Sequence, residues 1–243
     1  MAISVKSYIN SFNVRSASIL LIILIAGDII FILFTFLNLF LHINDPMLNV
    51  KTERGYSEFY QYIKYFLISV LLIYISIKNS SIHYFSWVLV FVYLFIDDLF
   101  EIHERVGTLI ANHLEFTAPL GLTLQEVGEL SVTMAASVVL AVFVLISYKY
   151  GSKEFRKISR DIFMFLLLLF FFGVFLDMAH LTVDFRFSIK FILIVIEDGG
   201  EMLSASCILW YVYLLALRGT KADYYLCDFL GLFQNNSTEI ISK

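Results

Sequence analysis

The sequence Ile196-Glu197-Asp198-Gly199-Gly200-Glu201-Met202 places three carboxylates and two glycines in the middle of an apolar run, about 187–217. That run is long enough for a helix that crosses a bilayer. An acidic residue at the bilayer centre costs roughly 2.5–3.5 kcal/mol on insertion scales, so such residues usually face a partner, a cavity or an ion. Spacings of three and four residues let Glu197, Asp198 and Glu201 share one helix face. We therefore expect one wall of a polar site inside a membrane protein.

The composition is typical of a polytopic membrane protein. Of the 243 residues, 60% are hydrophobic, 25 are Phe and only 2 are Pro, and the mean hydropathy is +0.83. These values exclude an average soluble domain and a disordered chain. No basic face indicates a nucleic acid partner, and the two cysteines do not form the pattern of a disulfide framework.

Six apolar runs predict an all-α fold with six transmembrane helices. They cover about 17–41, 59–77, 84–105, 122–148, 161–182 and 187–217. The first run is too long for a signal peptide and no small-residue cleavage site follows it, so we interpret it as a retained helix. A polar loop follows the first run, and a basic segment, residues 149–160, separates the fourth from the fifth. No internal repeat is visible, so we expect a single transmembrane domain, residues 1–243.

Basic residues predict the orientation of the chain in the membrane. Six spans place both termini on one side, which then holds eleven Lys and Arg residues against five on the other, with Lys64 inside the second run. The positive-inside rule therefore favours cytoplasmic termini, in what we expect to be a bacterial inner membrane. The acidic clusters of the last four runs then lie in the outer half of the membrane.

Carboxylates outnumber their possible partners in this outer half. Between the third and sixth runs twelve acidic residues face three basic ones, Arg105, Arg186 and Lys190. Protonation or bound cations must therefore neutralise the excess. Carboxylates mixed with imidazole suit iron, manganese or zinc, whereas a purely oxygen site would suit calcium or magnesium. The candidate metal ligands are Asp97, Asp98, Glu101, His103, Glu104, Glu126, Glu129, Asp177, His180, Glu197, Asp198 and Glu201.

Helical spacing sorts the candidates of the third run. If Asp97 defines 0°, Glu101 falls at about 40° and Glu104 at about 340°, which makes one narrow stripe. Asp98 falls at about 100° and His103 at about 240°. His103 can therefore join the stripe only if the helix ends or bulges near it.

The set of ligands resembles that of ferritin-like di-iron bundles. Those proteins use a Glu from each of two helices and a Glu-x-x-His pair from each of two others, all projecting inward. Asp177-x-x-His180 and Glu126-x-x-Glu129 have the same i, i+3 spacing. The resemblance implies a four-helix bundle of the third to sixth runs around two metal ions. The chain departs from the pattern because Asp177 replaces Glu, a second acid-x-x-His pair is missing and the helices are apolar.

The chain also resembles a group of uncharacterised bacterial integral membrane proteins. The shared motifs are Asp97-Asp98-(x4)-His103-Glu104 and Glu197-Asp198-(x2)-Glu201-Met202. The resemblance covers the third to sixth runs and implies no reaction. It favours the residues of these two motifs over Glu101.

Three functions remain open on the sequence alone. The first is a membrane-embedded oxidoreductase with two transition-metal ions, iron first and manganese or zinc as alternatives, acting on a hydrophobic small molecule from the bilayer. The second is a proton or divalent-cation transporter, which needs a polar path that the inner halves of the last four runs lack. The third is a membrane subunit with a structural metal site. The sequence specifies neither the electron donor nor the substrate.

Asp28 and the Gly199-Gly200 pair can each be explained by helix packing as well as by a role in the site. Asp28 is a lone acid in the first run, and a hydrogen bond between helices explains it as well as a functional role does. Gly199-Gly200 permits either a close approach of two helices or a local bulge between ligands.

Overall fold

A computed structural model describes residues 2–41, 45–52, 54–113, 122–176, 178 and 187–219, and every regular element among them is helical. The elements are α1 Ala2–Leu41, η1 Pro46–Leu48, α2 Tyr56–Lys78, η2 Ile82–Tyr84, α3 Phe85–Phe100, α4 Ile102–Ala111, α5 Leu124–Tyr150, α6 Lys153–Phe170, η4 Phe171–Leu176 and α8 Phe187–Arg218. The predicted all-α class is confirmed.

Among the described residues, five helical segments are long and apolar enough to cross a membrane. They are Arg15–Asn38, Tyr56–Lys78, Ile82–Phe100, Leu124–Tyr150 and Lys153–Leu176. They match the first five predicted runs and are compatible with an integral membrane protein. The 32-residue helix α8 is longer than each of them, but its three central carboxylates set its composition apart from theirs.

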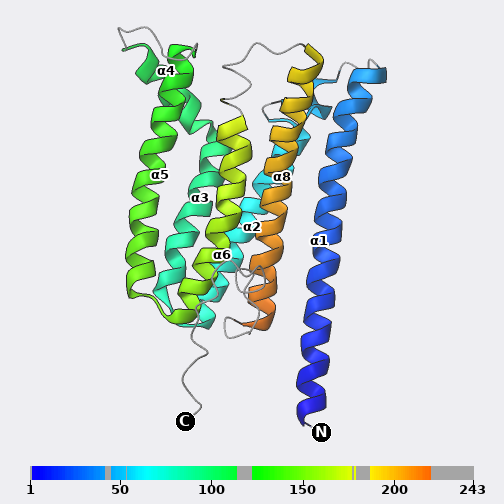
Figure 1. Ribbon diagram of the computed structural model, residues 1–243, viewed down its shortest axis with the longest axis vertical. Helices are drawn as coiled ribbons and strands as arrows, with labels where there is room; N and C mark the ends of the chain where they lie inside the picture. The colour runs from blue at the N-terminus through cyan, green and yellow to red at the C-terminus, as the bar shows by residue number, and fades with distance from the viewer. Residues whose placement is uncertain are drawn as a thin grey trace, which may run out of the picture.

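The helices run side by side, with α4 and the start of α8 at the upper end in Figure 1 and the α5–α6 turn at the lower end. Helix α2 packs against both α3 and α8, α1 and α6 pack against α8, and α5 packs against α4 and α3. Helix α2 therefore belongs to the bundle that we predicted from the third to sixth runs alone. That four-helix arrangement left out a central member.

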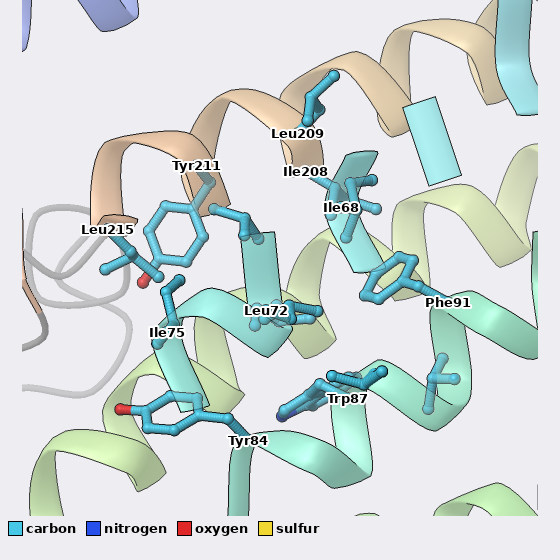
Figure 2. Close-up of a cluster of buried hydrophobic side chains, with 14 of the residues drawn as sticks. Ile68, Leu72, Ile75, Tyr84, Trp87, Phe91, Ile208, Leu209, Tyr211 and Leu215 are labelled. Carbon is cyan, nitrogen blue, oxygen red and sulfur yellow. The ribbon is translucent and has the colours of Figure 1, made fainter. Parts of the chain in front are cut away.

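The lower half of the bundle is filled by an apolar core. Ile68 and Leu72 of α2, Phe91 of α3, and Ile208 and Val212 of α8 are completely buried and belong to one apolar cluster. Figure 2 shows the side chains of Ile68, Leu72, Phe91 and Ile208 between the helices. Close packing of this kind leaves few voids as large as a water molecule. The three helices are therefore joined by an apolar contact below the level of the acidic residues.

Three predicted helix boundaries are wrong. The first helix begins at Ala2 rather than near residue 17. The third helix does not continue to residue 105, because α3 ends at Phe100 and α4 begins at Ile102. Helix α6 begins at Lys153 rather than near 161, so much of the basic segment is helical. Ser152 explains this start, since its hydroxyl oxygen accepts a hydrogen bond from the Phe155 N–H at 3.1 Å.

Glycines allow the close helix contacts. A Cβ atom on Gly128 would lie 2.2 Å from the Gly107 carbonyl oxygen, so α4 and α5 cross at these two residues. A Cβ atom on Gly199 would meet Ile32 of α1, and one on Gly200 would meet Phe172 of η4. Because α8 is a continuous helix at both positions, the glycine pair serves helix approach rather than a bulge.

Candidate functional site

The break between α3 and α4 creates the best-defined part of the site. Glu101 has φ 52° and ψ 45°, a left-handed conformation that is rare for residues other than glycine, Asn and Asp. The chain turns there, and the Asp97 carboxylate accepts a hydrogen bond from the His103 backbone N–H at 3.0 Å. Its other oxygen lies 3.0 Å from His103 Nδ1. The helix end thus brings together two candidates that a continuous helix would separate.

The Asp97 carboxylate orients the imidazole of His103 and raises its pKa. Their hydrogen bond raises the pKa of His103 to about 9, because the carboxylate stabilises the charged ring. The second ring nitrogen, Nε2, lies 3.9 Å from Glu104 Oε1. A carboxylate on one ring nitrogen that leaves the other for a ligand is the usual support of a metal-binding histidine. Asp97 therefore has the position of a supporting group rather than of a ligand.

Glu101 is neutralised by arginines. Its Oε1 lies 2.7 Å from Arg54 Nε, and its Oε2 accepts a hydrogen bond from Arg105 Nη2 at 3.2 Å. Both arginine side chains are more than half exposed. Glu101 thus uses both oxygens at the edge of the site, and the expected stripe with Asp97 and Glu104 does not form.

Helix α2 supplies polar partners that sequence reasoning missed. Gln61 Nε2 lies 3.1 Å from Glu201 Oε2 on α8 and 3.1 Å from the Tyr65 hydroxyl. Gln61 therefore links Tyr65 of α2 to the Glu201 carboxylate of α8.

A second contact joins α2 to Asp98. The Tyr62 hydroxyl lies 2.7 Å from Glu58 Oε2 and 3.1 Å from the backbone carbonyl oxygen of Asp98. Glu58, Gln61, Tyr62 and Tyr65 recur at helical spacing near the start of α2. This polar stripe at the start of the second run was the signal that could have placed α2 in the site.

The π-helix η4 closes the site beside Glu201. A Cβ atom on Gly173 would lie 2.0 Å from Glu201 Oε1, so only a glycine leaves room for this carboxylate. Short π-helical turns inside longer helices occur frequently at functional sites. Glu201 thus lies between Gln61 of α2 and Gly173 of η4.

The two acids of α5 serve local structure. Glu126 and Thr123 form a capping box, with Thr123 N–H 2.7 Å from Glu126 Oε2 and Glu126 N–H 3.2 Å from Thr123 Oγ1. Glu129 Oε1 accepts a hydrogen bond from Gln125 Nε2 at 2.9 Å, and Glu129 packs against Gly107. The hydrogen bonds that the structure describes for these two carboxylates are therefore local to the start of α5.

A separate ionic cluster lies one turn below Glu201. Lys64 Nζ donates hydrogen bonds to Asp28 Oδ1 at 2.5 Å and to the Met202 carbonyl oxygen at 3.0 Å. Ser206 donates to the other oxygen of Asp28 at 2.6 Å. The ammonium group also lies 4.2 Å from the centre of the Tyr60 ring. Asp28 is thus part of a buried ion pair that links α1, α2 and α8.

Two candidates, Asp177 and His180, lie outside the described residues. Glu197 and Asp198 precede Glu201 on α8, and each has one carboxylate oxygen out of contact with water. Among the residues that the structure describes, no group of three or more Asp, Glu, His or Cys side chains is gathered closely enough to hold a metal ion. The described part of the site therefore contains candidate metal ligands only in pairs, such as His103 and Glu104.

In the part of the chain that the structure describes, the fold and these contacts define a helical protein with an acidic upper end and five helices long and apolar enough to cross a membrane. The chain belongs to the family described as Domain of unknown function (DUF8692), whose model matches residues 18–217. No curated protein and no solved structure matches the chain.

Proposed function

We propose that this chain is a membrane-embedded oxidoreductase that binds two transition-metal ions at its acidic upper end. Iron is the metal that we propose, and manganese is the alternative. The observation that carries the proposal is the trio Asp97, His103 and Glu104, in which a carboxylate orients an imidazole and leaves Nε2 beside a second carboxylate. Mixed carboxylate and imidazole donors suit iron and manganese.

The geometry of His103 and Glu104 fits a shared metal ion. Bonds from histidine nitrogen and carboxylate oxygen to a metal such as zinc are about 2.0–2.2 Å long, and the two donor atoms are 3.9 Å apart. One ion can therefore contact both. We propose Asp177 and His180 as further ligands of this ion, and Asp98 with Glu201 as donors to the second.

The remaining side chains would orient the metal ligands and exclude water from the site. Gln61 would orient the Glu201 carboxylate through its hydrogen bond, and Gln61 also contacts the Tyr65 hydroxyl. A bound iron pair would supply dioxygen activation or electron acceptance. The apolar helices around it would exclude water and admit a hydrophobic substrate from the bilayer. We also propose α8 as the sixth span, which would place α1 residue 2 and α8 residue 218 on the cytoplasmic side.

The apolar core weighs against the transport alternative. A relay of protons or cations through the membrane needs polar groups or water along its length. Below Lys64 the contact of α2, α3 and α8 includes Ile68, Leu72, Phe91 and Ile208, all completely buried. A buried carboxylate in that half, Asp161, accepts a hydrogen bond from the Tyr211 hydroxyl. This packing supports a site that is closed toward the lower end.

The test is the metal content of protein purified without added chelator. We expect at least about one iron or manganese ion per chain, and its loss when His103→Ala is combined with Glu104→Gln, because both donors of one ion then disappear. His113→Ala is the matched control, since His113 is an exposed histidine on the turn that ends the same helix. The proposal would be refuted if the wild-type protein contained no metal. It would also be refuted if the wild type, the double variant and the His113→Ala control contained equal amounts of metal.

A further inference from the structure

The lower end of the bundle carries a basic surface that the proposed metal site does not use. It is formed by Lys78 at the end of α2, Lys149 at the end of α5, and Lys153 and Arg156 in the first turn of α6, and all four are exposed. We call these four residues the basic surface. None of the carboxylates discussed above lies near it, so it needs an explanation of its own.

The structure fixes the direction in which α6 presents its cations. Phe155, Ile158 and Ile162 are completely buried and hold one face of the helix against the bundle. The Phe155 ring lies 5.1 Å from that of Tyr84, and Trp87 Nε1 donates a hydrogen bond to Ser159 Oγ at 2.9 Å. Lys153 and Arg156 lie on the opposite face. They cannot turn inward without breaking these contacts.

The other two cations are held at the same end. Lys78 Nζ donates a hydrogen bond to the Ala216 carbonyl oxygen at 3.0 Å and lies 5.2 Å from the centre of the Tyr74 ring. Lys149 Nζ lies 5.5 Å from the ring of Tyr150, which is 69% exposed. Exposed Tyr and Lys side chains at the end of apolar helices are typical of the bilayer interface. Lys78 and Lys149 thus lie at the ends of the apolar helices α2 and α5.

The acids of these turns do little to neutralise the surface. Asp161 is completely buried and accepts a hydrogen bond from the Tyr211 hydroxyl, so it faces away from solvent. In the described residues 149–161 the other acid is Glu154, against five Lys and Arg residues. A net positive charge therefore remains at this end of the bundle.

We propose that the basic surface binds the phosphate headgroups of anionic phospholipids in the leaflet that it faces. Clustered Lys and Arg residues beside a membrane helix attract anionic lipid, and each contributes roughly 1 kcal/mol near the bilayer surface. The lipid would hold α2, α5 and α6 together at an end where only a short turn joins α5 to α6. This inference does not depend on a metal ion at the upper end.

The test uses detergent-solubilised full-length protein titrated with phosphatidylglycerol or with phosphatidylcholine. Native mass spectrometry counts the lipid retained, and thermal unfolding follows its effect on stability. We expect phosphatidylglycerol to be retained in preference and to raise the melting temperature. The triple variant Lys149→Gln, Lys153→Gln, Arg156→Gln should bind it at least about tenfold more weakly, because three cations are lost.

The matched control keeps the charge: Lys149→Arg, Lys153→Arg, Arg156→Lys should retain the preference for phosphatidylglycerol. Lys51→Gln, at the upper end, should also leave it unchanged. Equal retention of both lipids by the wild type would overturn the proposal, as would full retention by the triple variant. If that variant does not fold, the lipid preference of the wild-type protein is measured in about 1 M salt. Screening should abolish the preference for phosphatidylglycerol, and an unchanged preference would overturn the proposal.

Discussion

Replacement of Lys64 by Met in α2 is expected to destabilise the protein strongly. The Lys64 ammonium contacts the Asp28 carboxylate, the Met202 carbonyl oxygen and the Tyr60 ring, and neither charged side chain is exposed. Loss of the cation leaves the Asp28 charge buried without a countercharge. Removal of one partner of a buried pair costs about 3–5 kcal/mol.

Two companion variants separate the charge from the hydrogen bonds. Ser206→Ala removes one hydrogen bond to Asp28, and such bonds between membrane helices average about 0.6 kcal/mol. Asp28→Leu combined with Lys64→Met replaces the pair by apolar groups, which is often neutral or stabilising. We therefore expect a large loss for Lys64→Met, a small one for Ser206→Ala and recovery of most of the loss in the double variant.

The free energy of unfolding can be measured in detergent by SDS titration followed by circular dichroism. A loss of less than about 1 kcal/mol for Lys64→Met would show that the pair is not buried as the structure has it. A double variant as unstable as the sum of its two single variants would refute the electrostatic reasoning, since uncoupled side chains give additive losses.

Three further substitutions test the close contacts. Gly128→Ala should cost about 1–3 kcal/mol, because its Cβ would lie 2.2 Å from a backbone carbonyl oxygen of α4, and the same titration measures it. Gly173→Ala should displace the Glu201 carboxylate and lower metal affinity about tenfold or more in a metal titration. Gly199→Ala is the control and should leave metal affinity unchanged, because its Cβ would meet only the flexible end of Ile32. Ser159→Ala should leave the Trp87 indole N–H unpaired, cost about 1–3 kcal/mol and shift the tryptophan fluorescence. An unchanged value in any of these measurements would contradict the corresponding contact.

The helical class and the membrane-length segments could be predicted because they depend on composition and run length, which are local properties. The prediction that His103 joins the acids only at a helix end is consistent with the structure, which ends α3 at Phe100. The end itself could not be predicted, because hydrophobicity does not change at Glu101. What stops the helix there is a left-handed backbone at that residue, supported by Arg54 and Arg105.

The contribution of α2 was missed for a different reason. Lys64 and Asp28 are 36 residues apart, and nothing in the local sequence pairs them. The early start of α6 was missed because residues 149–160 are charged, and the burial of Phe155 and Ile158 outweighs that charge only once the bundle is formed. Pairing between distant segments, rather than the class of the fold, was therefore what the sequence did not reveal.

X-ray absorption spectroscopy at the iron and manganese edges of the purified protein tests the proposed metal site most directly. We expect an edge signal with nitrogen and oxygen neighbours at about 2.0–2.2 Å, which weakens in His103→Ala and persists in His113→Ala. Protein that folds normally and shows no metal edge, or a signal that His103→Ala leaves unchanged, would contradict it.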